Sequence, residues 1–339
     1  MNQNWNEFLA RQGLSQDTEH FADQAAELKA ARDATIVVPI ADQGVIRASG
    51  EEAAGFLHNL MTNDVKNIPA DGARLAALCT AKGRMMASFV IWREGADYLL
   101  QLSADILPTI QKKLTMYVLR SKVKISDAST ERVLIGLAGP QAEALLGSLG
   151  IKPGPVMATA TFEGGTAIRI DGQRFVLAVA ADAAEPVWAK LAATAKPAGM
   201  AAWRLLEISA GQPRIVAATQ ETFTPQMVNY ELPAVGGVNF QKGCYPGQEI
   251  VARTQYLGKV KRRMYRAKLD TAFPPGTSVF TTETGEQHCG TVVSTAPAPE
   301  GGFESLLVVQ SSGMEADAVH VGSPTGPKAS FQPLPYVIS

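Results

Sequence analysis

The residues best suited to chemistry surround one cysteine. Cys244 stands in the string Lys-Gly-Cys-Tyr-Pro-Gly-Gln-Glu, between Lys242 and Glu249. Pro246 suits the first position of a helix and Gly258 suits a helix C-terminus, so Cys244 should lie at or just before a helix N-terminus. Free backbone N–H groups and a neighbouring ammonium group favour the thiolate form of a cysteine. The string therefore predicts a reactive or ligating thiol at Cys244, activated by Lys242.

Alternative interpretations of this segment stay open. Free cysteine is among the most buried residue types, so Cys244 could instead be a small buried hydrophobic residue. Gln248 and Glu249 fall in the predicted first helical turn, where they complement the helix dipole. Glu249 could equally orient Lys242 or accept a hydrogen bond from a ligand. Nucleophilic hydrolysis is less favoured, because no histidine stands near Cys244 in the sequence.

A run of basic residues follows the predicted helix. It comprises Lys259, Lys261, Arg262 and Arg263, with Arg253 before it. In a chain of formal net charge −1, this cluster predicts a surface that binds an anionic ligand, an RNA phosphate or an acidic partner. The alternative is a solvated strand edge protected by its cations. The run has no interleaved aromatic residues, so it does not support stacking of single-stranded nucleic acid.

Length and composition are those of an ordinary globular protein with two or three domains. The chain has 339 residues, of which 46% are hydrophobic and 19% are charged. No apolar run approaches the roughly 20 residues that span a bilayer, and the N-terminus lacks the pattern of a secretory signal. The cysteines Cys79, Cys244 and Cys289 are far apart, so we expect no disulfide framework and a reducing cytoplasm. Without a Cys-x-x-Cys pair, no metal site is predicted.

Hydrophobic periodicity predicts a mixture of helices and strands. Helices are expected over residues 1–32, 53–61, 106–119, 140–149, 186–195 and 200–210. Strands are expected over 35–40 and 44–47, as a pair, and over 74–78, 85–93, 98–102, 122–127, 131–139, 166–170 and 174–178. Short β-like segments separated by Pro and Gly fill residues 265–339. The pattern predicts an α+β fold with a split βαβ arrangement and a small terminal β-barrel or sandwich.

The string around Cys244 also resembles a family signature. KGCY-x-GQE, followed by VAR and later G-x-x-KRR, is similar to the signature of the YgfZ family of folate-binding, iron–sulfur-linked proteins. These are relatives of the aminomethyltransferase (T-protein) of glycine cleavage, and members usually carry Thr where this chain has Pro246. Other segments follow the family's order of blocks: GEEAAGFLHNLMTNDVKNIP, LCTAKGRMMASFVIW, LTMYVLRSKVKI, ISAGQPR and FTPQMVNYE.

The resemblance implies the three-domain, cloverleaf-like aminomethyltransferase fold, with a channel that holds tetrahydrofolate. Residues 1–48 plus 133–264 would form a discontinuous split-βαβ folate-binding domain. Residues 49–132 would be an inserted α+β domain, and 265–339 a C-terminal β-barrel. From the residues alone, Asn63-Asp64 and Lys82-Gly83-Arg84 are better explained as a helix-end turn and a hairpin turn, respectively. The resemblance assigns folate binding to Asn63, Asp64, Arg84, Ser209, Tyr245, Gln248 and Arg253.

Two departures from the T-protein pattern bear on activity. T-proteins carry an Asp-Asp pair in the strand after the Gly-rich turn, where this chain has Met85-Met86-Ala87-Ser88. Aminomethyl transfer would therefore lose its acid–base group. Ser209 occupies the position of the pterin-binding Glu, which weakens the expected folate site. Glu207, two residues earlier on the same helix, faces another direction.

The favoured function is a folate-binding accessory protein for the assembly, repair or maintenance of iron–sulfur enzymes, including those that thiolate tRNA. Its expected partners are folate and iron–sulfur client or assembly proteins, with direct tRNA binding the weaker option and no membrane. Three separated cysteines predict that the chain holds no stable cluster alone. One alternative is a tetrahydrofolate-dependent one-carbon transferase, in which Asp64 or Glu249 would supply the missing carboxylate. Another is a non-catalytic interaction scaffold with a buried, inert Cys244.

Overall fold

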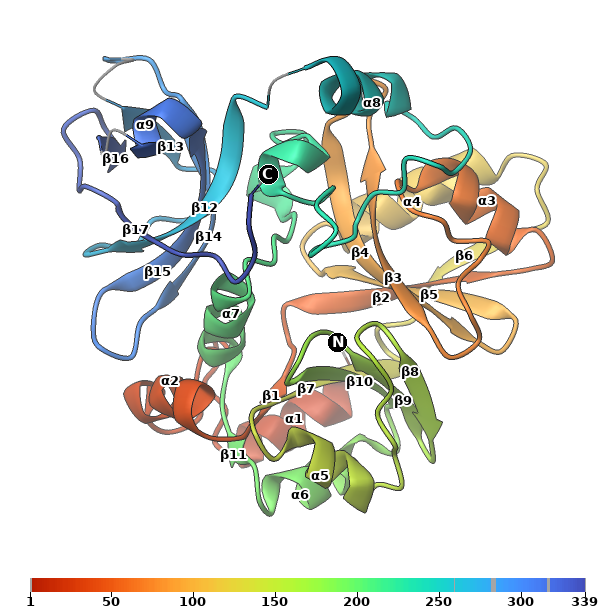
Figure 1. Ribbon diagram of the computed structural model, residues 1–339. Helices are drawn as coiled ribbons and strands as arrows, with labels where there is room; N and C mark the ends of the chain where they lie inside the picture. Colours follow the sequence, from red (N-terminus) through yellow and green to blue (C-terminus); the bar gives the residue numbers. More distant parts are fainter. Residues whose placement is uncertain (1, 259, 282–284, 316–317, 339) are drawn as a thin grey trace. The chain divides into compact units, whose positions relative to one another are not determined.

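The chain forms two compact units in a computed structural model that describes residues 2–258, 260–281, 285–315 and 318–338 (Figure 1). The first unit comprises Met1–Leu57, Val65–Arg74 and Phe89–Trp203. The second comprises His58–Asp64, Leu75–Ser88 and Arg204–Ser339. Lys259, from the predicted basic run, lies outside the described residues.

A six-stranded sheet with helices packed against it makes up much of the first unit. The sheet has the order β11-β1-β7-β10-β9-β8, and only the β1–β11 pair is parallel among its described pairs. Its strands are β1 (Ile36–Pro39), β7 (Arg132–Ala138), β8 (Thr159–Phe162), β9 (Gly165–Arg169), β10 (Arg174–Ala180) and β11 (Lys196–Pro197). The helices of this region are α1 (Gln3–Arg11), α2 (Gln24–Asp33), α5 (Ala142–Ser148) and α6 (Ala184–Ala192).

The core of this sheet forms because alternate strand residues face α1, α5 and α6. Ile135 and Leu177 are fully buried there, and the Trp5 and Trp188 rings meet edge to face with centroids 5.8 Å apart. On β7, a Cβ at Gly136 would stand 2.6 Å from Cε3 of Trp203. The glycine is therefore required for the close approach of that indole ring.

A second sheet has the order β3-β4-β5-β2-β6. Its strands are β2 (Gln43–Ser49), β3 (Ala73–Cys79), β4 (Met85–Glu94), β5 (Asp97–Ser103) and β6 (Lys124–Asp127), and the accompanying helices are α3 (Ala53–Leu60) and α4 (Leu107–Val118). Most of β3 and the start of β4 belong to the second unit, and the remaining strands belong to the first.

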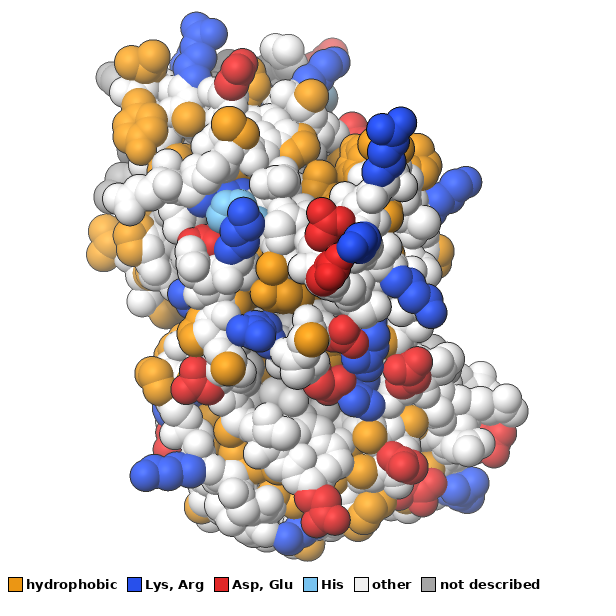
Figure 2. Space-filling model, turned by 90° about the vertical axis from the view of Figure 1, so that its right-hand side faces the viewer, with side chains coloured by type: hydrophobic (Ala, Val, Ile, Leu, Met, Phe, Trp, Pro, Cys, Tyr) orange, Lys and Arg blue, Asp and Glu red, His pale blue; other side chains and the backbone are white. Residues whose placement is uncertain are grey.

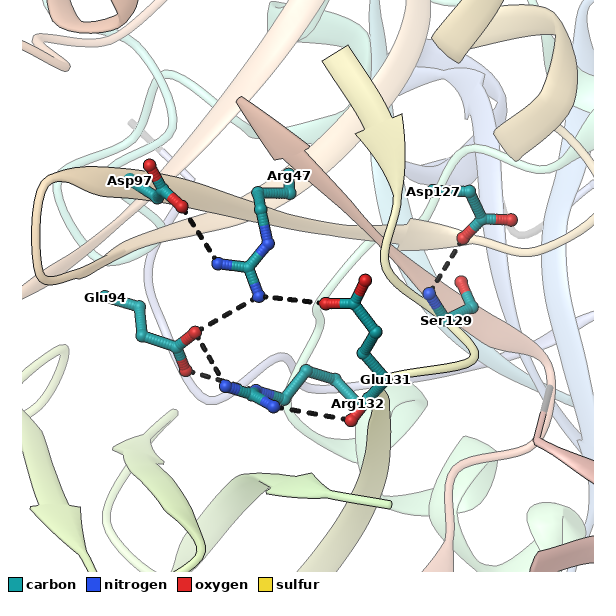
Figure 3. A network of polar contacts seen from close by, with 7 residues as sticks. All are labelled: Arg47, Glu94, Asp97, Asp127, Ser129, Glu131 and Arg132. Atoms are coloured by element: carbon teal, nitrogen blue, oxygen red, sulfur yellow. Dashed lines mark hydrogen bonds and ion pairs between the residues drawn. The ribbon is translucent and has the colours of Figure 1, made fainter. Parts of the chain in front are cut away.

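A charge network on the first unit joins residues from several of its strands (Figure 3). The Arg47 guanidinium on β2 lies 3.0 Å from Asp97 and 3.3 Å from Glu94. Arg132, which begins β7, donates to the same Glu94 carboxylate at 2.8 Å. Because two half-buried guanidinium groups share one carboxylate, the network holds β2 and β7 to the β4–β5 hairpin.

The second unit carries the C-terminal sheet, in the order β16-β13-β14-β15-β12-β17 with antiparallel pairs throughout the described pairings. The sheet curls (Figure 1) around a core that includes Val292, Leu307 and Val309. Its strands are β12 (Arg262–Leu269), β13 (Ser278–Thr281), β14 (Gly290–Pro297), β15 (Phe303–Gln310), β16 (Val319–Val321) and β17 (Ser330–Gln332). The remaining elements are α7 (Met200–Ser209), η1 (Ala217–Thr219), η2 (Pro225–Val228), α8 (Gln248–Leu257) and α9 (Ser311–Glu315).

The predicted α+β fold with a β-rich C-terminal region is confirmed, and two local predictions are wrong. Residues 1–32 form two helices, because the chain turns after α1 at Gly13, whose φ is 94°. The segments 35–40 and 44–47 do not pair. β1 hydrogen-bonds with β7 and β11, whereas β2 hydrogen-bonds with β5 and β6. Sequence proximity suggested a hairpin, but each strand pairs on both of its edges with strands that are distant in sequence.

On the face drawn in Figure 2, basic and acidic side chains are interspersed, without a large patch of one charge. This distribution agrees with the formal net charge of −1. Within the described ranges, no helix is long and apolar enough to cross a membrane.

Candidate functional site

The segment around Cys244 is held by Lys242 against the end of α3. The Lys242 ammonium donates hydrogen bonds to the carbonyl oxygens of His58 and Met61, the latter at 2.6 Å. It also lies 4.9 Å from the centroid of the Tyr245 ring. The last carbonyl groups of a helix have no partner within the helix, and a cation is favoured beside them. Lys242 therefore caps α3 and joins the cysteine segment to it.

A turn upstream of Lys242 strengthens this attachment. The Asn239 side-chain oxygen accepts hydrogen bonds from the backbone N–H groups of Gln241 and Lys242, at 2.8 and 3.1 Å. The Asn239 backbone N–H donates to the carbonyl oxygen of Thr62 at 2.9 Å. Asparagine is favoured in turns because its short side chain can bond the backbone two residues ahead.

Two glycines fit the downstream end of the segment against the β3–β4 turn. Gly247, the N-cap of α8, has a φ of 82°, and a Cβ there would stand 2.7 Å from Cα of Gly83. Gly83, in the turn itself, has a φ of 69°. A side chain at Gly247 would be strained by its own backbone and would meet the turn, so the two backbones pack directly.

The start of α8 differs from the sequence prediction. The helix begins at Gln248, so the expected place of Pro246 at its first position is wrong. Cys244 lies outside the helix, ahead of the left-handed Gly247. The predicted helix end at Gly258 is confirmed. The helix cannot begin before Gln248, because the left-handed conformation of Gly247 cannot be part of a right-handed helix.

Cys244 is exposed, whereas Cys79 and Cys289 are buried. Burial raises the pKa of the Cys79 thiol to about 12, and the Cys289 thiol donates to the carbonyl oxygen of Val279 at 3.5 Å. Thiolate chemistry requires both access and ionisation. Cys244 is thus the accessible thiol of the three, and it is not a small buried hydrophobic residue.

Lys242 has an unusual environment for a lysine. Burial lowers its pKa from 10.5 to about 8, against the opposing effects of Asp64 and Cys244. The carboxylate that acts on it is Asp64, while Glu249 is exposed in the first turn of α8. Two of its N–H groups are directed at carbonyl oxygens, so Lys242 positions the cysteine segment as much as it supplies charge to the thiol.

A histidine that the sequence did not single out lies beside the cysteine segment. His58 Nδ1 is 3.1 Å from Asp64 Oδ1, and His58 Nε2 is 3.9 Å from the position that a Cβ on Gly243 would occupy. Its carbonyl oxygen accepts from Lys242. No spacing rule could have found the contact of His58 with Lys242, because the two residues are 184 positions apart.

Asn63, a predicted folate contact, is committed to the backbone around it. Its amide nitrogen donates to the carbonyl oxygens of Leu75 and Gly236 at 2.7 and 2.8 Å, and its side-chain oxygen accepts from the Asp64 N–H. The residue is 5% exposed. Its hydrogen-bonding capacity is therefore largely used inside the second unit.

Arg84 and Tyr245 keep polar groups that could serve a ligand. The Arg84 guanidinium donates from Nη1 to the carbonyl oxygen of Thr222 at 2.6 Å, which leaves other N–H groups of the fork. The Tyr245 hydroxyl is buried and has no hydrogen-bond partner among the described residues. Burial raises the pKa of this hydroxyl, and Cys79 raises it further.

The remaining predicted residues lie on or beside α7, α8 and β12. Ser209 ends α7 half-buried, and Glu207 faces Arg214 at 3.5 Å. Arg263 does not join an exposed basic cluster, because it is 8% exposed and ion-paired with Glu231. Glu249, Arg253 and Lys261 are exposed, whereas Gln248 and Arg262 are half-buried. In the part of the chain that the structure describes, no group of three His, Cys, Asp or Glu side chains could hold a metal ion.

Comparisons with known proteins agree with this architecture. Residues 4–233 match the model of the GCVT N-terminal domain. The tRNA-modifying protein YgfZ of Vibrio vulnificus (strain YJ016) is 36% identical over 66% of this chain and 67% of its own length. The protein of the same name from Escherichia coli O6:H1 is 31% identical over 87% and 91%. In fold, the chain is similar to glycine cleavage system aminomethyltransferase T from Bartonella henselae, with a TM-score of 0.76 and 19% identity over 99% of this chain and 98% of that one.

Proposed function

The chain belongs to the GCVT N-terminal domain family and to the YgfZ proteins, and from this premise we propose that it is a folate-binding accessory protein that supports tRNA modification. The enzymes it serves would be iron–sulfur enzymes, including those that thiolate tRNA, and Cys244 would be its reactive thiol. The name of the relatives supports the tRNA link, and the domain family supports the folate link.

The observation that carries the thiol part of the proposal is the presentation of Cys244. Lys242, Asn239 and Gly247 hold the backbone on both sides of it, while the thiol itself is exposed. A group held in place by neighbouring backbone contacts loses little conformational entropy when it reacts or ligates. A cysteine with no role beyond packing would be buried, as Cys79 and Cys289 are.

The polar groups of the second unit fit a folate in part. Arg84 has N–H groups for a carboxylate of the glutamate tail, and the unpartnered Tyr245 hydroxyl could pair with a polar atom of the ligand. Ser209 offers a neutral hydroxyl in place of a carboxylate. Asn63 would act indirectly, by holding its loop. When bound, tetrahydrofolate would supply a carrier for a one-carbon unit.

Aminomethyl transfer itself is not part of the proposal. Residues 85–88 at the start of β4 contain no carboxylate and are buried. The proton-transfer group of a transferase would therefore have to come from elsewhere. Asp64 is the carboxylate that acts on Lys242 of the cysteine segment.

Selective alkylation tests the proposal. The folded protein is treated with iodoacetamide over a range of pH, with and without tetrahydrofolate, and the modified cysteines are mapped by mass spectrometry. We expect fast modification of Cys244 alone, and a change in its rate when folate is added. Cys79 and Cys289 are the internal controls for unfolding. Slow modification that folate does not affect would exclude the reactive thiol.

Folate binding is measured separately on Arg84→Gln. Because the substitution removes the charge that would pair with the glutamate carboxylates, tetrahydrofolate should bind about tenfold more weakly, as followed by isothermal titration calorimetry. Arg93→Gln, at a half-buried arginine of the first unit, is the control. Equal affinity in both variants would remove Arg84 from the folate site.

A further inference from the structure

A second run of basic residues, which the proposed function does not use, lies on α4 and on the segment that leads into β6. It comprises Lys112, Lys113, Arg120, Lys122 and Lys124. Residues 106–126 contain no Asp or Glu, although the formal net charge of the whole chain is −1. A cluster of one sign of charge creates a local potential that attracts ions of the opposite sign.

The structure places these cations on one part of the first unit. α4 packs against β6, so the cations of the helix and Lys124 of the strand lie on neighbouring elements. Four of the five cations are exposed, and Lys113 is half-buried. The helix turns its other side inward, where Leu107, Ile110 and Leu114 are buried. The exposed cations therefore belong to the side of this region that faces solvent.

Acidic side chains neutralise little of this charge. Lys122 is ion-paired with Glu51 at 2.5 Å, but 75% of the lysine and 65% of the glutamate side chain are exposed, so the pair is weak. The Glu52 carboxylate accepts from the Lys122 backbone N–H. In the part of the chain that the structure describes, the other four cations make no ion pair. Asp105 and Asp127 lie just beyond the two ends of the run.

Large apolar side chains are exposed beside the cations. Met116, Tyr117 and Leu119 are 63%, 39% and 89% exposed. Leu119, the C-cap of α4, has a φ of 47°, which strains a residue other than glycine. Packing does not explain a leucine that is both strained and exposed, and such outliers are concentrated at functional sites. We call these three residues and the five cations the α4 surface.

We propose that the α4 surface binds RNA, with its cations on phosphates and its apolar side chains against unpaired bases. RNA carries a phosphate on each nucleotide, so one strand can engage several cations at once. Unpaired bases stack on aromatic rings, and Tyr117 offers such a ring. The choice of tRNA as the RNA rests on the proposed function, because relatives of this chain are named tRNA-modifying proteins.

Two observations favour RNA over an acidic protein as the partner. Unlike the basic run at 259–263, this run has an aromatic residue among its cations, and the Lys113 ammonium lies 6.0 Å from the centroid of the Tyr117 ring. A ring beside a cation can bind a base and the adjoining phosphate. The α4 surface is also small for a stable protein interface, which takes about 20–30 residues from each partner.

Fluorescence anisotropy tests the proposal with two labelled probes, an in vitro transcribed tRNA and a short oligouridylate. We expect the wild type to bind both, with an affinity that falls as salt is added. Lys112→Gln/Arg120→Gln should bind about tenfold more weakly, with a salt dependence that is lower by about two phosphate contacts. Tyr117→Ala should bind about fivefold more weakly with an unchanged salt dependence, because stacking is not ionic.

Matched variants separate this surface from general charge and exposure. Lys152→Gln/Lys190→Gln removes two exposed lysines of the same unit that lie outside the α4 surface, and it should match the wild type. Tyr256→Ala, at a tyrosine that is 70% exposed on α8, should also match it. Equal losses in the control and test variants would overturn the proposal.

Measurements on the wild-type protein cover a variant that fails to fold. Ultraviolet crosslinking of the bound tRNA, mapped by mass spectrometry, should modify Tyr117. Poly-L-glutamate is the competing probe. If it binds the wild type as tightly as RNA does, and loses the same affinity in the test variants, the partner is an acidic protein and the RNA assignment is overturned. A wild type that does not bind the tRNA overturns it as well.

Failure of this inference is distinguishable from failure of the proposed function. Tetrahydrofolate binding and Cys244 alkylation are measured on the same variants and should be unchanged, because the substitutions lie on the first unit and Cys244 on the second. Loss of RNA binding with both of these intact concerns the α4 surface alone. A wild type that binds tRNA but neither binds folate nor reacts at Cys244 would overturn the proposed function instead.

Discussion

At the scale of single residues, Lys242 shows how one side chain serves structure and chemistry together. It caps the end of α3 through the carbonyl oxygens of His58 and Met61, and it holds Cys244 two residues away. A lysine buried to 8% exposure is uncommon, because the charged form is poorly solvated. Its two carbonyl partners partly replace the lost water.

The pH dependence of stability should report this burial. The pKa of Lys242 is lowered from 10.5 to about 8 in the folded protein. Between these values the unfolded chain binds a proton that the folded protein has released, so the free energy of unfolding should rise with pH from about 8 to 10.5. Lys242→Met should lose this rise, as measured by urea unfolding at pH 7.5 to 10.5. Lys268→Met, at an exposed lysine on β12, is the control and should keep it.

The slope is a better test than the absolute stability. Lys242→Met leaves two carbonyl oxygens without a donor, at a cost of roughly 1–3 kcal/mol, but it also removes a poorly solvated charge. These effects oppose each other at neutral pH. Identical slopes in Lys242→Met and the wild type would mean that the buried ammonium is not the titrating group.

At the scale of elements, the position of the cysteine segment depends on a contact between two turns. Gly247 at the N-cap of α8 and Gly83 in the β3–β4 turn meet backbone to backbone. Neither element determines this contact alone. A left-handed glycine starts the helix, and the glycine of the hairpin leaves space for it.

Gly247→Ala should disturb this contact. Its φ of 82° strains any other residue, and the added Cβ would stand 2.7 Å from Cα of Gly83. We expect a loss of about 2–3 kcal/mol in the free energy of unfolding, together with altered alkylation of Cys244, because the segment must move. Gly95→Ala is the matched control, since Gly95 also has a positive φ, of 63°, but its Cβ would meet nothing within 4 Å. It should cost only about 1 kcal/mol. Equal losses would show that the backbone strain alone matters.

At the scale of the whole molecule, the end of the chain returns to a helix that lies far earlier in the sequence. The Tyr336 hydroxyl donates to the carbonyl oxygen of Gly211, just after α7, at 2.7 Å. Burial raises the pKa of this hydroxyl, and a hydrogen bond with the Asn229 side chain opposes the rise. Gly211 has a φ of 62°, and a Cβ there would stand 2.8 Å from the Tyr336 ring. This hydrogen bond therefore joins two segments of the second unit that are 125 residues apart in sequence.

Tyr336→Phe should remove the hydrogen bond to Gly211 and lower the stability of the second unit. The substitution keeps the ring but removes the hydroxyl, which leaves the Gly211 carbonyl oxygen without this donor. We expect a loss of about 1–1.5 kcal/mol in the free energy of unfolding, measured by chemical denaturation. Tyr256→Phe, where 70% of the tyrosine is exposed, should be neutral. A neutral Tyr336→Phe would mean that the chain end does not contribute to the stability of the second unit.

The division into three domains stays a prediction. The folate-binding part over 1–48 plus 133–264, the inserted part over 49–132 and the terminal part over 265–339 follow from the family resemblance. The α+β fold and the similarity to aminomethyltransferase T stand independently of that division.

Features that depend on neighbouring residues could be predicted from the chain. The periodicity of residues such as 132–138 and 200–209 determined strands and helices, because burial of one face requires that spacing. The string around Cys244 determined the family, because so many unusual residues stand together. The sequence also placed the end of α8 at Gly258.

Contacts between distant residues could not be predicted in this way and required the fold. Lys242 reaches His58 across 184 residues, and Arg263 is paired with Glu231 instead of lying in a surface cluster. Asn63 is occupied by the carbonyl groups of Leu75 and Gly236. A hydrogen bond or ion pair depends on distances of about 3 Å, and between distant segments these are set by the packing of the whole chain. Local pattern carries no information about them, and for that reason the contact of Lys242 with the His58 carbonyl oxygen could be seen only in the fold.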